Sequence, residues 1–505
     1  MTSPIPPRSA SRRLKLPRAG WSGLFLLAIV LAATTNGSFW IDECVTADVA
    51  RHPSLMGAWR AMVQLKFAEV QLPFYIGYIW AFEKLFGHSE LALRLAALPF
   101  FVGGMTLLAG AFARRTGRVW PLLVAVGLSP FAWYYLNEAR LYAMQMGVTA
   151  MIVAALIQLN LPPAAPERTE SRWLTLYLLG VILLSGISML GQMWAGAALL
   201  AVFVVVPKTR WATWWDRHRG KLLLTAGALL LLGGYYLWSL TIGARATAVG
   251  ATNLQTILFI FYEQLGCVGP GPGRVELRAA GVAALKPFAV GLGTYATVVG
   301  LVLVAGLVAL WQNGSRRLTL GALACLALPA GLILLAGVAT HFRVLGRHFA
   351  PLAVILFVIL GLGLLHLWQR RGCVGRGLAT GFVVVTLASC LLIRFAPRHA
   401  KDDCRQAAQL AKAALAQNEI VWWNAGDMAA TYYDVPIANS GSNQTGVLVV
   451  FDPQPAFAIK QPKPGTVITS KPDIYDSQGV LAGYLKENGY QPITNLMAFT
   501  LWKRK

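Results

Sequence analysis

The sequence predicts a polytopic α-helical membrane protein with a small α/β domain at its C-terminal end. Of the 505 residues, 56% are hydrophobic and only 13% are charged, and the mean hydropathy is +0.56. A soluble domain carries about 25% charged residues, and an apolar run of roughly 20 residues can cross the hydrocarbon core of a bilayer. Such runs follow one another up to residue 396, and shorter ones replace them after it.

The formal net charge of +23 is distributed in a regular way. Lys and Arg gather in short links between apolar runs, as the positive-inside rule describes for cytoplasmic loops. Because membrane spans separate these clusters, they do not form the single basic face of a nucleic-acid-binding protein. We therefore expect no nucleic-acid partner. The basic clusters lie at residues 8–18, 114–118, 168–172, 208–221, 316–317 and 370–376.

With the basic links taken as cytoplasmic, hydropathy and loop charge predict about eleven spans. The N-terminus is then cytoplasmic, and everything after Pro397 is external (periplasmic), as in a multi-pass protein of the inner (plasma) membrane. The predicted spans are residues 20–40, 91–113, 119–135, 140–160, 173–190, 191–207, 221–240, 286–311, 318–340, 350–368 and 377–396.

Residues 41–90 are predicted to form one long external loop within a membrane domain of residues 1–396. The stretch PFYIGYIWAFEKLF at 73–86 is apolar. A run of about 14 residues is too short to span a bilayer and suits a helix at the membrane surface. Counting it as a span would also place the cluster at 114–118 outside and reverse the charge bias downstream.

Residues 397–505 are predicted to form the small external α/β domain. KDDCRQAAQLAKAALAQNEIVWWNAGD has the pattern of a helix, a turn and a strand, VLVVFD that of a buried strand, and YDSQGVLAGYLKENGY that of a helix ending at Gly489. A length of about 105 residues lies within the usual size range of a domain.

Ionisable and aromatic residues gather at the external ends of the predicted spans. Ionisable groups there are costly when they face lipid, so they usually line a cavity or pair with one another. The candidates are Asp42 and Glu43 after the first span; Glu69, Gln71 and Tyr75 in the long loop; Glu138, Arg140 and Tyr142 before the fourth span; Arg274 in GPGPGR; and Arg343, Arg347 and His348 before the tenth span.

These residue types suit a lipid-linked anionic substrate. Guanidinium groups bind phosphate oxygens bidentately, so the arginines, with Tyr142 and His348, are candidates for binding a phosphate-bearing donor. Asp42, Glu43 and Glu138 are candidates for the general base. Carboxylates also ligate divalent cations. A bound divalent cation is therefore compatible with the sequence, which specifies no cofactor. Loop residues 69–75 are candidates for contacting an acceptor.

Each cluster also has a structural interpretation. Asp42 and Glu43 fit the start of a solvated loop, and Glu138 with Arg140 fits an ion pair that caps a span. Arg343 and Arg347 fit anchors to lipid head groups. The Tyr and Trp residues fit an aromatic belt at the membrane surface.

The six cysteines have no metal-ligand spacing. Three of them, Cys44, Cys267 and Cys404, fall on the predicted external side. A disulfide among these three is compatible with the sequence but not specified by it.

Four stretches taken together resemble a known family. FWIDECVTADVAR, QLPFYIGYIWAFEKLFGHSELALRLAALPF, SPFAWYYLNEARLYAM and FRVLGRHFAP, in this order, are similar to bacterial relatives of the protein O-mannosyltransferases and the lipid A aminoarabinose transferase, which are membrane glycosyltransferases of the GT-C fold. KDDCRQAAQLA also resembles the start of the external domain of many such enzymes. The resemblance covers nearly the whole chain.

The resemblance implies a polyprenyl-phosphate sugar donor and transfer on the external face to a lipid, glycan or protein acceptor, with inversion. It also implies a carboxylate in the first external loop, which Asp42 matches. The chain departs from the pattern at Leu72, where a first Pro is frequent, and at Gln71, where His or Lys is frequent. These departures bear on the donor contact made from that loop.

A second function class is a transporter or flippase of lipid-linked sugars, which would also hold arginines that bind phosphate. Such a protein should carry polar groups at mid-membrane and broken helices. Here the interiors of the predicted spans are nearly free of charge, which favours chemistry at the surface. A glycan polymerase or ligase would differ from the first class only in its acceptor. Whether the sugar is a hexose or a pentose, the sequence does not specify.

Overall fold

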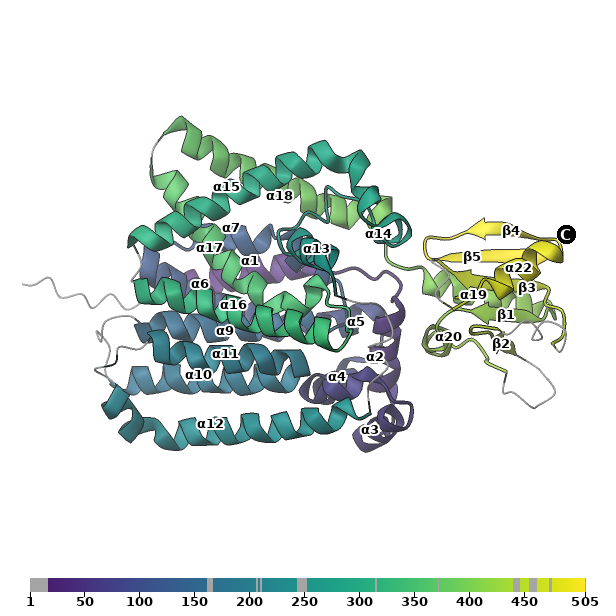
Figure 1. The fold of residues 1–505 in the computed structure, drawn as a ribbon, viewed down its shortest axis with the longest axis horizontal. Helices are drawn as coiled ribbons and strands as arrows, with labels where there is room; N and C mark the ends of the chain where they lie inside the picture. The colour runs from purple at the N-terminus through teal and green to yellow at the C-terminus, as the bar shows by residue number, and fades with distance from the viewer. Residues whose placement is uncertain are drawn as a thin grey trace, which may run out of the picture.

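The computed structural model describes residues 17–160, 167–205, 208, 211–242, 252–313, 316–370, 372–438, 446–453, 461–471 and 475–504. A bundle of long apolar helices forms most of the molecule, and a small sheet with its helices lies beyond one end of this bundle (Figure 1). The predicted fold class is therefore confirmed.

Seven described helices are long and apolar enough to cross a membrane, and three shorter apolar helices accompany them. With the consecutive short helices α7 and α8, they occupy the positions of the eleven predicted spans. The bundle helices are α1 Pro17–Ala33, α6 Leu98–Thr116, α7 Trp120–Gly127, α8 Pro130–Leu136, α9 Tyr142–Asn160, α10 Glu167–Ile187, α11 Met189–Val205, α12 Trp211–Leu240, α15 Ala289–Asn313, α16 Arg316–Ala339, α17 Ala350–Gln369 and α18 Cys373–Phe395.

Two spans differ from the prediction. The first ends at Ala33 rather than near residue 40, and a segment without helix follows it. The third is broken between α7 and α8, where the Ser129 hydroxyl accepts a hydrogen bond from the Ala132 N–H at 3.2 Å. Pro130 at the first position of α8 has no N–H to leave unpaired. Both residues are helix-start signals, so α8 begins anew here.

Short elements cover the end of the bundle that faces the sheet (Figure 1). One of them, α4, corresponds to the predicted surface helix; with 14 residues, it is not among the helices long enough to span a membrane. The short elements are α2 Ile41–Arg51, α3 Leu55–Gln64, α4 Pro73–Phe86, α5 Glu90–Leu95, α13 Leu254–Gln264 and α14 Arg274–Ala280, with 3-10 helices Ala68–Gln71, Gly281–Phe288, Gly346–Phe349 and Pro397–His399.

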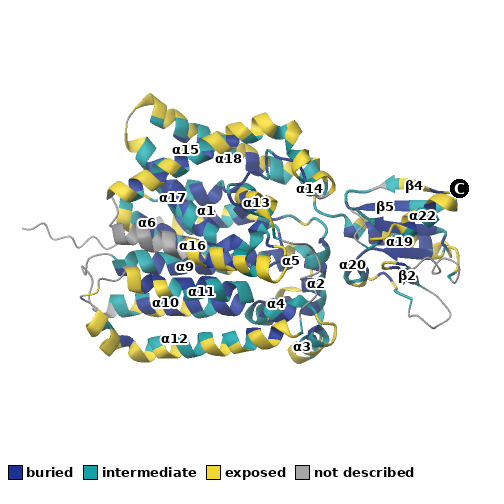
Figure 2. Ribbon diagram, in the orientation of Figure 1, coloured by how far each residue is buried: buried dark blue, intermediate teal, exposed yellow. Residues whose placement is uncertain are grey.

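The exposed surface of the bundle is apolar. Figure 2 shows much of α12 exposed on the outside of the bundle, whereas α9 is largely buried within it. The exposed side chains of α12 include Leu223, Leu224, Leu230 and Leu231. Exposed apolar side chains of this kind are expected where lipid, rather than water, surrounds the helices.

Glycines bring α6 and α9 into close contact. A Cβ atom on Gly104 of α6 would collide with the carbonyl of Gly147 on α9, and a Cβ on Gly147 would collide with the carbonyl of Phe100. Small residues at such a crossing allow helix backbones in a membrane to approach closely. This contact fixes the N-terminal end of α9, which begins directly after Glu138 and Arg140.

The C-terminal part contains a five-stranded sheet with the order β2-β1-β3-β5-β4. Strand β1 pairs in parallel with β2 and β3, whereas β5 pairs antiparallel with β3 and β4. Parallel neighbours need a crossover between them, and α20 lies in the crossover from β1 to β2. The elements are α19 Cys404–Ala416, β1 Val421–Asn424, α20 Asp427–Tyr432, β2 Val447–Val449, β3 Thr466–Ser470, α22 Val480–Glu487, β4 Tyr490–Asn495 and β5 Phe499–Arg504.

Candidate functional site

The candidate site begins at the first turn of α2, where Asp42 and Glu43 are adjacent. The Glu43 carboxylate accepts a hydrogen bond from the Trp40 N–H at 3.3 Å, so it caps the helix to which it belongs. Carboxylates near a helix N-terminus stabilise the unpaired N–H groups and the positive end of the helix dipole. The side chains of Asp42 and Glu43 lie in different surroundings, which indicates different roles for the two acids.

The Glu43 side chain is fully buried and fully engaged. Arg94 of α5 donates to its two oxygens at 2.9 and 3.0 Å, and the Ala139 N–H donates to Oε1 at 2.7 Å. Burial acts to raise the pKa of this carboxyl, but the charges of Lys401 and Arg94, with the hydrogen bonds, outweigh it and lower the pKa. Glu43 is therefore ionised, and it ties three separate segments together.

Asp42 retains access to solvent. Its side chain is 28% exposed, and Oδ2 lies 3.4 Å from Nη1 of Arg347. The backbone carbonyl of Asp42 is tied to the segment before α9 through a hydrogen bond from Arg140 Nη1 at 3.1 Å. Its carboxylate thus stands at the edge of the cluster, opposite one guanidinium group.

Arg140 joins α2 to the 3-10 helix Ala68–Gln71. Its Nη1 also donates to the Thr46 hydroxyl at 2.9 Å and to Glu69 Oε1 at 3.1 Å. The Tyr75 hydroxyl donates to the Ala139 carbonyl at 2.8 Å, which holds the neighbouring backbone from the α4 side. Burial of the Tyr75 ring raises the pKa of its hydroxyl, so the hydroxyl remains a donor. These contacts make Arg140 and Tyr75 part of the framework around Asp42.

Glu138 has one carboxylate oxygen without a hydrogen-bond partner. The residue is 2% exposed, and its Oε1 lies 3.6 Å from Nζ of Lys401, while the buried Oε2 has no partner. A buried acceptor left unsatisfied costs about 1–3 kcal/mol. Oε2 of Glu138 is therefore an available acceptor inside the cluster.

Two arginines lie against the same indole ring. The guanidinium carbon of Arg274 is 3.9 Å from the centre of the Trp40 ring, and that of Arg347 is 5.4 Å from it. Arg347 also lies 5.8 Å from the Tyr142 ring, and its buried Nε–H has no hydrogen-bond partner. The indole ring therefore packs against both cations, and the phenol ring against Arg347, without neutralising their charge.

The other predicted residues do not join this cluster. Arg343 is exposed and takes part in none of the cluster contacts described above. The ring of His348 stacks on Phe342, and its Nδ1 accepts from the Leu345 N–H at 3.1 Å. Gln71 is half-buried at the end of its 3-10 helix, next to the start of α4.

Three residues of the cluster were not predicted: Arg94, Glu263 and Lys401. Arg94 interrupts the apolar stretch ELALRLAALPF, and an arginine in such a position is itself a signal of a buried partner. Glu263 accepts a hydrogen bond from the Tyr135 hydroxyl at 3.1 Å, and burial raises its pKa. Lys401 precedes the C-terminal sheet and lies 3.4 Å from Glu43 Oε2. No sequence signal distinguishes Glu263 and Lys401 from ordinary loop charges.

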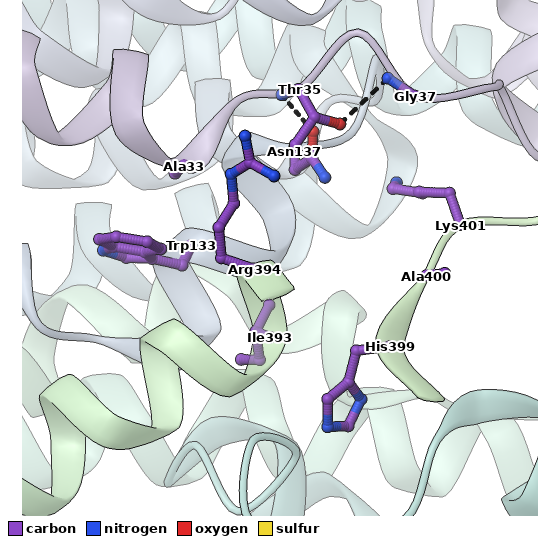
Figure 3. A pocket seen from close by; sticks show the side chains of 10 residues that line it. All are labelled: Ala33, Thr35, Gly37, Trp133, Asn137, Ile393, Arg394, His399, Ala400 and Lys401. Carbon is purple, nitrogen blue, oxygen red and sulfur yellow. Dashed lines mark hydrogen bonds between the residues drawn. The ribbon is translucent and has the colours of Figure 1, made fainter. Parts of the chain in front are cut away.

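A cavity of about 300 Å³ lies between the ends of α1 and α18. Figure 3 shows the side chains of Asn137, Arg394 and Lys401 around this opening. Because Lys401 also contacts Glu138, the cavity adjoins the carboxylate cluster. In the part of the chain that the structure describes, no three His, Cys, Asp or Glu side chains gather as ligands for a metal ion.

These elements define a class: a polytopic helical membrane protein, with its charged cluster at the end of the bundle that the small sheet faces. No protein-family model matches the sequence, and no curated protein matches it. Among solved structures, ArnT from Cupriavidus metallidurans in the apo state matches with a TM-score of 0.57 and 14% sequence identity, over 96% of this chain and 98% of that chain. ArnT from the same organism bound to undecaprenyl phosphate matches with a TM-score of 0.51, 14% identity and the same coverage. The likeness confirms the fold that the sequence resemblance implies.

Proposed function

We propose that this chain is a membrane glycosyltransferase, which moves a sugar from a polyprenyl-phosphate donor to a lipid, glycan or protein acceptor. The observation that carries the proposal is the pairing of a partly open carboxylate, Asp42, with Arg347 at 3.4 Å. A general base and a phosphate-binding group thus meet at one point. The fold shared with ArnT, which has been observed with undecaprenyl phosphate, supports this assignment.

Arg274 and Arg347 are the proposed contacts of the donor phosphate. Both lie against Trp40, and the Nε–H of Arg347 is free to donate. A phosphate oxygen forms a stronger charge-assisted hydrogen bond with guanidinium than a neutral group does. When the phosphate takes over the guanidinium of Arg347, Asp42 loses its partner and becomes available as a base.

The proposed reaction is a single displacement at the anomeric carbon. The acceptor hydroxyl attacks opposite the phosphate, the bond between this carbon and the phosphate oxygen breaks, and its electron pair leaves with polyprenyl phosphate. The proton of the acceptor hydroxyl passes to the carboxylate of Asp42. Attack from the opposite side inverts the configuration at the anomeric carbon.

The other two acids of the cluster have different proposed roles. Glu43 positions Asp42, because its own oxygens are held by Arg94, Ala139 and the start of α2. Glu138, with Oε2 unpaired, accepts a hydrogen bond from the acceptor or from the transferred sugar. The role of Glu43 requires an ionised carboxylate, which agrees with the lowered pKa of this residue.

We place this reaction on the external face of the inner membrane. The basic links at residues 114–118 and 370–376 belong on the cytoplasmic side by the positive-inside rule. The Asp42 cluster and the small sheet both lie at the other end of the bundle, away from these basic links (Figure 1). Donor sugars carried on a polyprenyl chain would therefore be used on that external face.

The direct test uses the purified chain, a panel of labelled polyprenyl-phosphate hexoses and pentoses, and an extract of the cell envelope as acceptor. We expect one donor class to transfer its label to an envelope component, with release of polyprenyl phosphate. Movement of labelled donor between vesicle leaflets without a glycosylated product would instead identify a transporter.

A further inference from the structure

Two buried cysteines from distant parts of the sequence are in contact. Cys44 belongs to α2, and Cys404 begins α19 of the C-terminal part. Both are free thiols in the structure and belong to one buried cluster, where Cys44 is a side-chain neighbour of Cys404, and the residues are 0% and 1% exposed. The contact lies at the junction between the bundle end and the sheet.

The surrounding contacts already hold both helices in place. The Phe39 and Tyr432 rings pack with their centres 5.2 Å apart, and the Ser38 hydroxyl accepts from the Arg405 N–H at 2.9 Å. Arg405 also forms an ion pair with Glu90. Because these contacts join the segment before α2 to α20 and to the start of α19, they hold the regions of the two cysteines together.

The location suits oxidation. Disulfides persist in oxidising compartments and are rare in the cytosol. The thiol pair lies at the bundle end that we assign to the external face. Cys373, in contrast, is exposed at the start of α18, next to the basic link assigned to the cytoplasm.

We propose that Cys44 and Cys404 form a disulfide that covalently joins α2, the helix carrying Asp42, to the C-terminal part. The two thiols lose two protons and two electrons as the S–S bond forms. A disulfide of an external thiol-oxidising protein receives them and is reduced to two thiols. The inference does not depend on the proposed transfer reaction, although it shares its assignment of the external face.

The bond would secure an ion pair of the site. Glu43 directly precedes Cys44, and Lys401 lies three residues before Cys404. Lys401 contacts both Glu43 and Glu138. A disulfide beside this ion pair would keep Lys401 close to the carboxylates of Glu43 and Glu138.

The arrangement of cysteines allows a sharp test. Cys44 is the only cysteine before residue 267. A protease site inserted between Asn160 and Glu167 would therefore yield an N-terminal fragment whose one thiol is Cys44. We expect the two fragments of the full chain, purified from membranes with free thiols blocked, to migrate together without a reducing agent and to separate after reduction.

Matched variants identify the partner. Cys404→Ser should separate the fragments without reduction, whereas Cys267→Ser and Cys390→Ser should leave them joined. Fragments of the otherwise unchanged chain that separate without reduction would overturn the proposal, because Cys44 would then be a thiol. Fragments that separate without reduction in Cys267→Ser but stay joined in Cys404→Ser would also overturn the proposal. Neither readout requires a donor or an acceptor, so failure here is distinct from failure of the proposed function.

Discussion

Asp42 and Glu43 show how two adjacent acids acquire opposite environments. Successive residues of a helix point about 100° apart, so one carboxylate turns into the bundle and the other towards Arg347. The sequence predicted that this pair stands at a site. It did not distinguish the buried residue from the open one, because that depends on where Arg94 and the turn before α9 come to lie.

Glu43→Gln should destabilise the fold. The change keeps the shape but leaves Arg94 buried beside a neutral group, and breaking a buried ion pair costs about 3–5 kcal/mol. A clearly lower thermal midpoint in detergent is the expected result. Glu487→Gln, at an exposed position of α22, is the matched control and should stay within about 0.5 kcal/mol of the unchanged chain. Equal midpoints for both variants would contradict the role given to Glu43.

The same residue predicts a dependence on pH. The pKa of Glu43 is lower in the folded protein than its ordinary value of 4.5. A carboxyl with a depressed folded pKa stabilises the protein fully above its unfolded pKa, and this contribution is lost as the pH falls through the folded pKa. The difference in midpoint between the unchanged chain and Glu43→Gln should hold from pH 7 to about 4.5 and shrink below it.

Arg274→Lys and Arg347→Lys should both weaken donor binding. An ammonium group cannot form the planar two-pronged contact with phosphate, and a hydrogen bond to a charged group contributes about 1.5–3 kcal/mol. We expect the donor dissociation constant to rise about tenfold or more in each variant. Arg343→Lys is the control, because Arg343 is exposed and outside the cluster. An effect confined to Arg343→Lys would move the phosphate site there.

Among the elements, the segment before α19, which carries Lys401, has a role that the sequence did not predict. It carries Lys401 into contact with Glu43 and Glu138, and burial lowers the pKa of this lysine. Lys401→Ala would leave both carboxylates without that charge. We expect reduced transfer together with faster proteolysis at the junction, and no such change for Lys412→Ala on the exposed side of α19. Full activity with unchanged proteolysis would show that this segment is only a tether.

The elements differ in how far the sequence could predict them. Long apolar runs and basic links located the apolar helices of the bundle, because length and charge are local properties. The break between α7 and α8 was missed although Ser129 and Pro130 are ordinary start signals, since a continuous apolar run outweighed them. Glu263 and Lys401 could not be assigned to the site, because only the folded chain brings α13 and the segment before α19 to the α2 end.

At the scale of the whole molecule, one proposal governs the others: the cluster and the sheet lie on the external (periplasmic) face of the membrane. Reporter fusions at Arg115 and after Lys505 should therefore report opposite sides of the membrane, with Arg115 cytoplasmic. Charge bias alone carries this orientation. Two fusions reporting the same side would refute the odd number of spans and remove the external site.

The most direct measurement is the turnover of Asp42→Asn, made alongside its affinity for the donor. Asparagine keeps the size of the side chain but cannot accept the proton, and losing a general base typically costs about 10²–10⁴-fold in rate. The account predicts that purified Asp42→Asn binds the donor near normally and fails to transfer the sugar by that factor. Near-normal turnover of Asp42→Asn, with Glu138→Gln inactive, would contradict it and assign the base to Glu138.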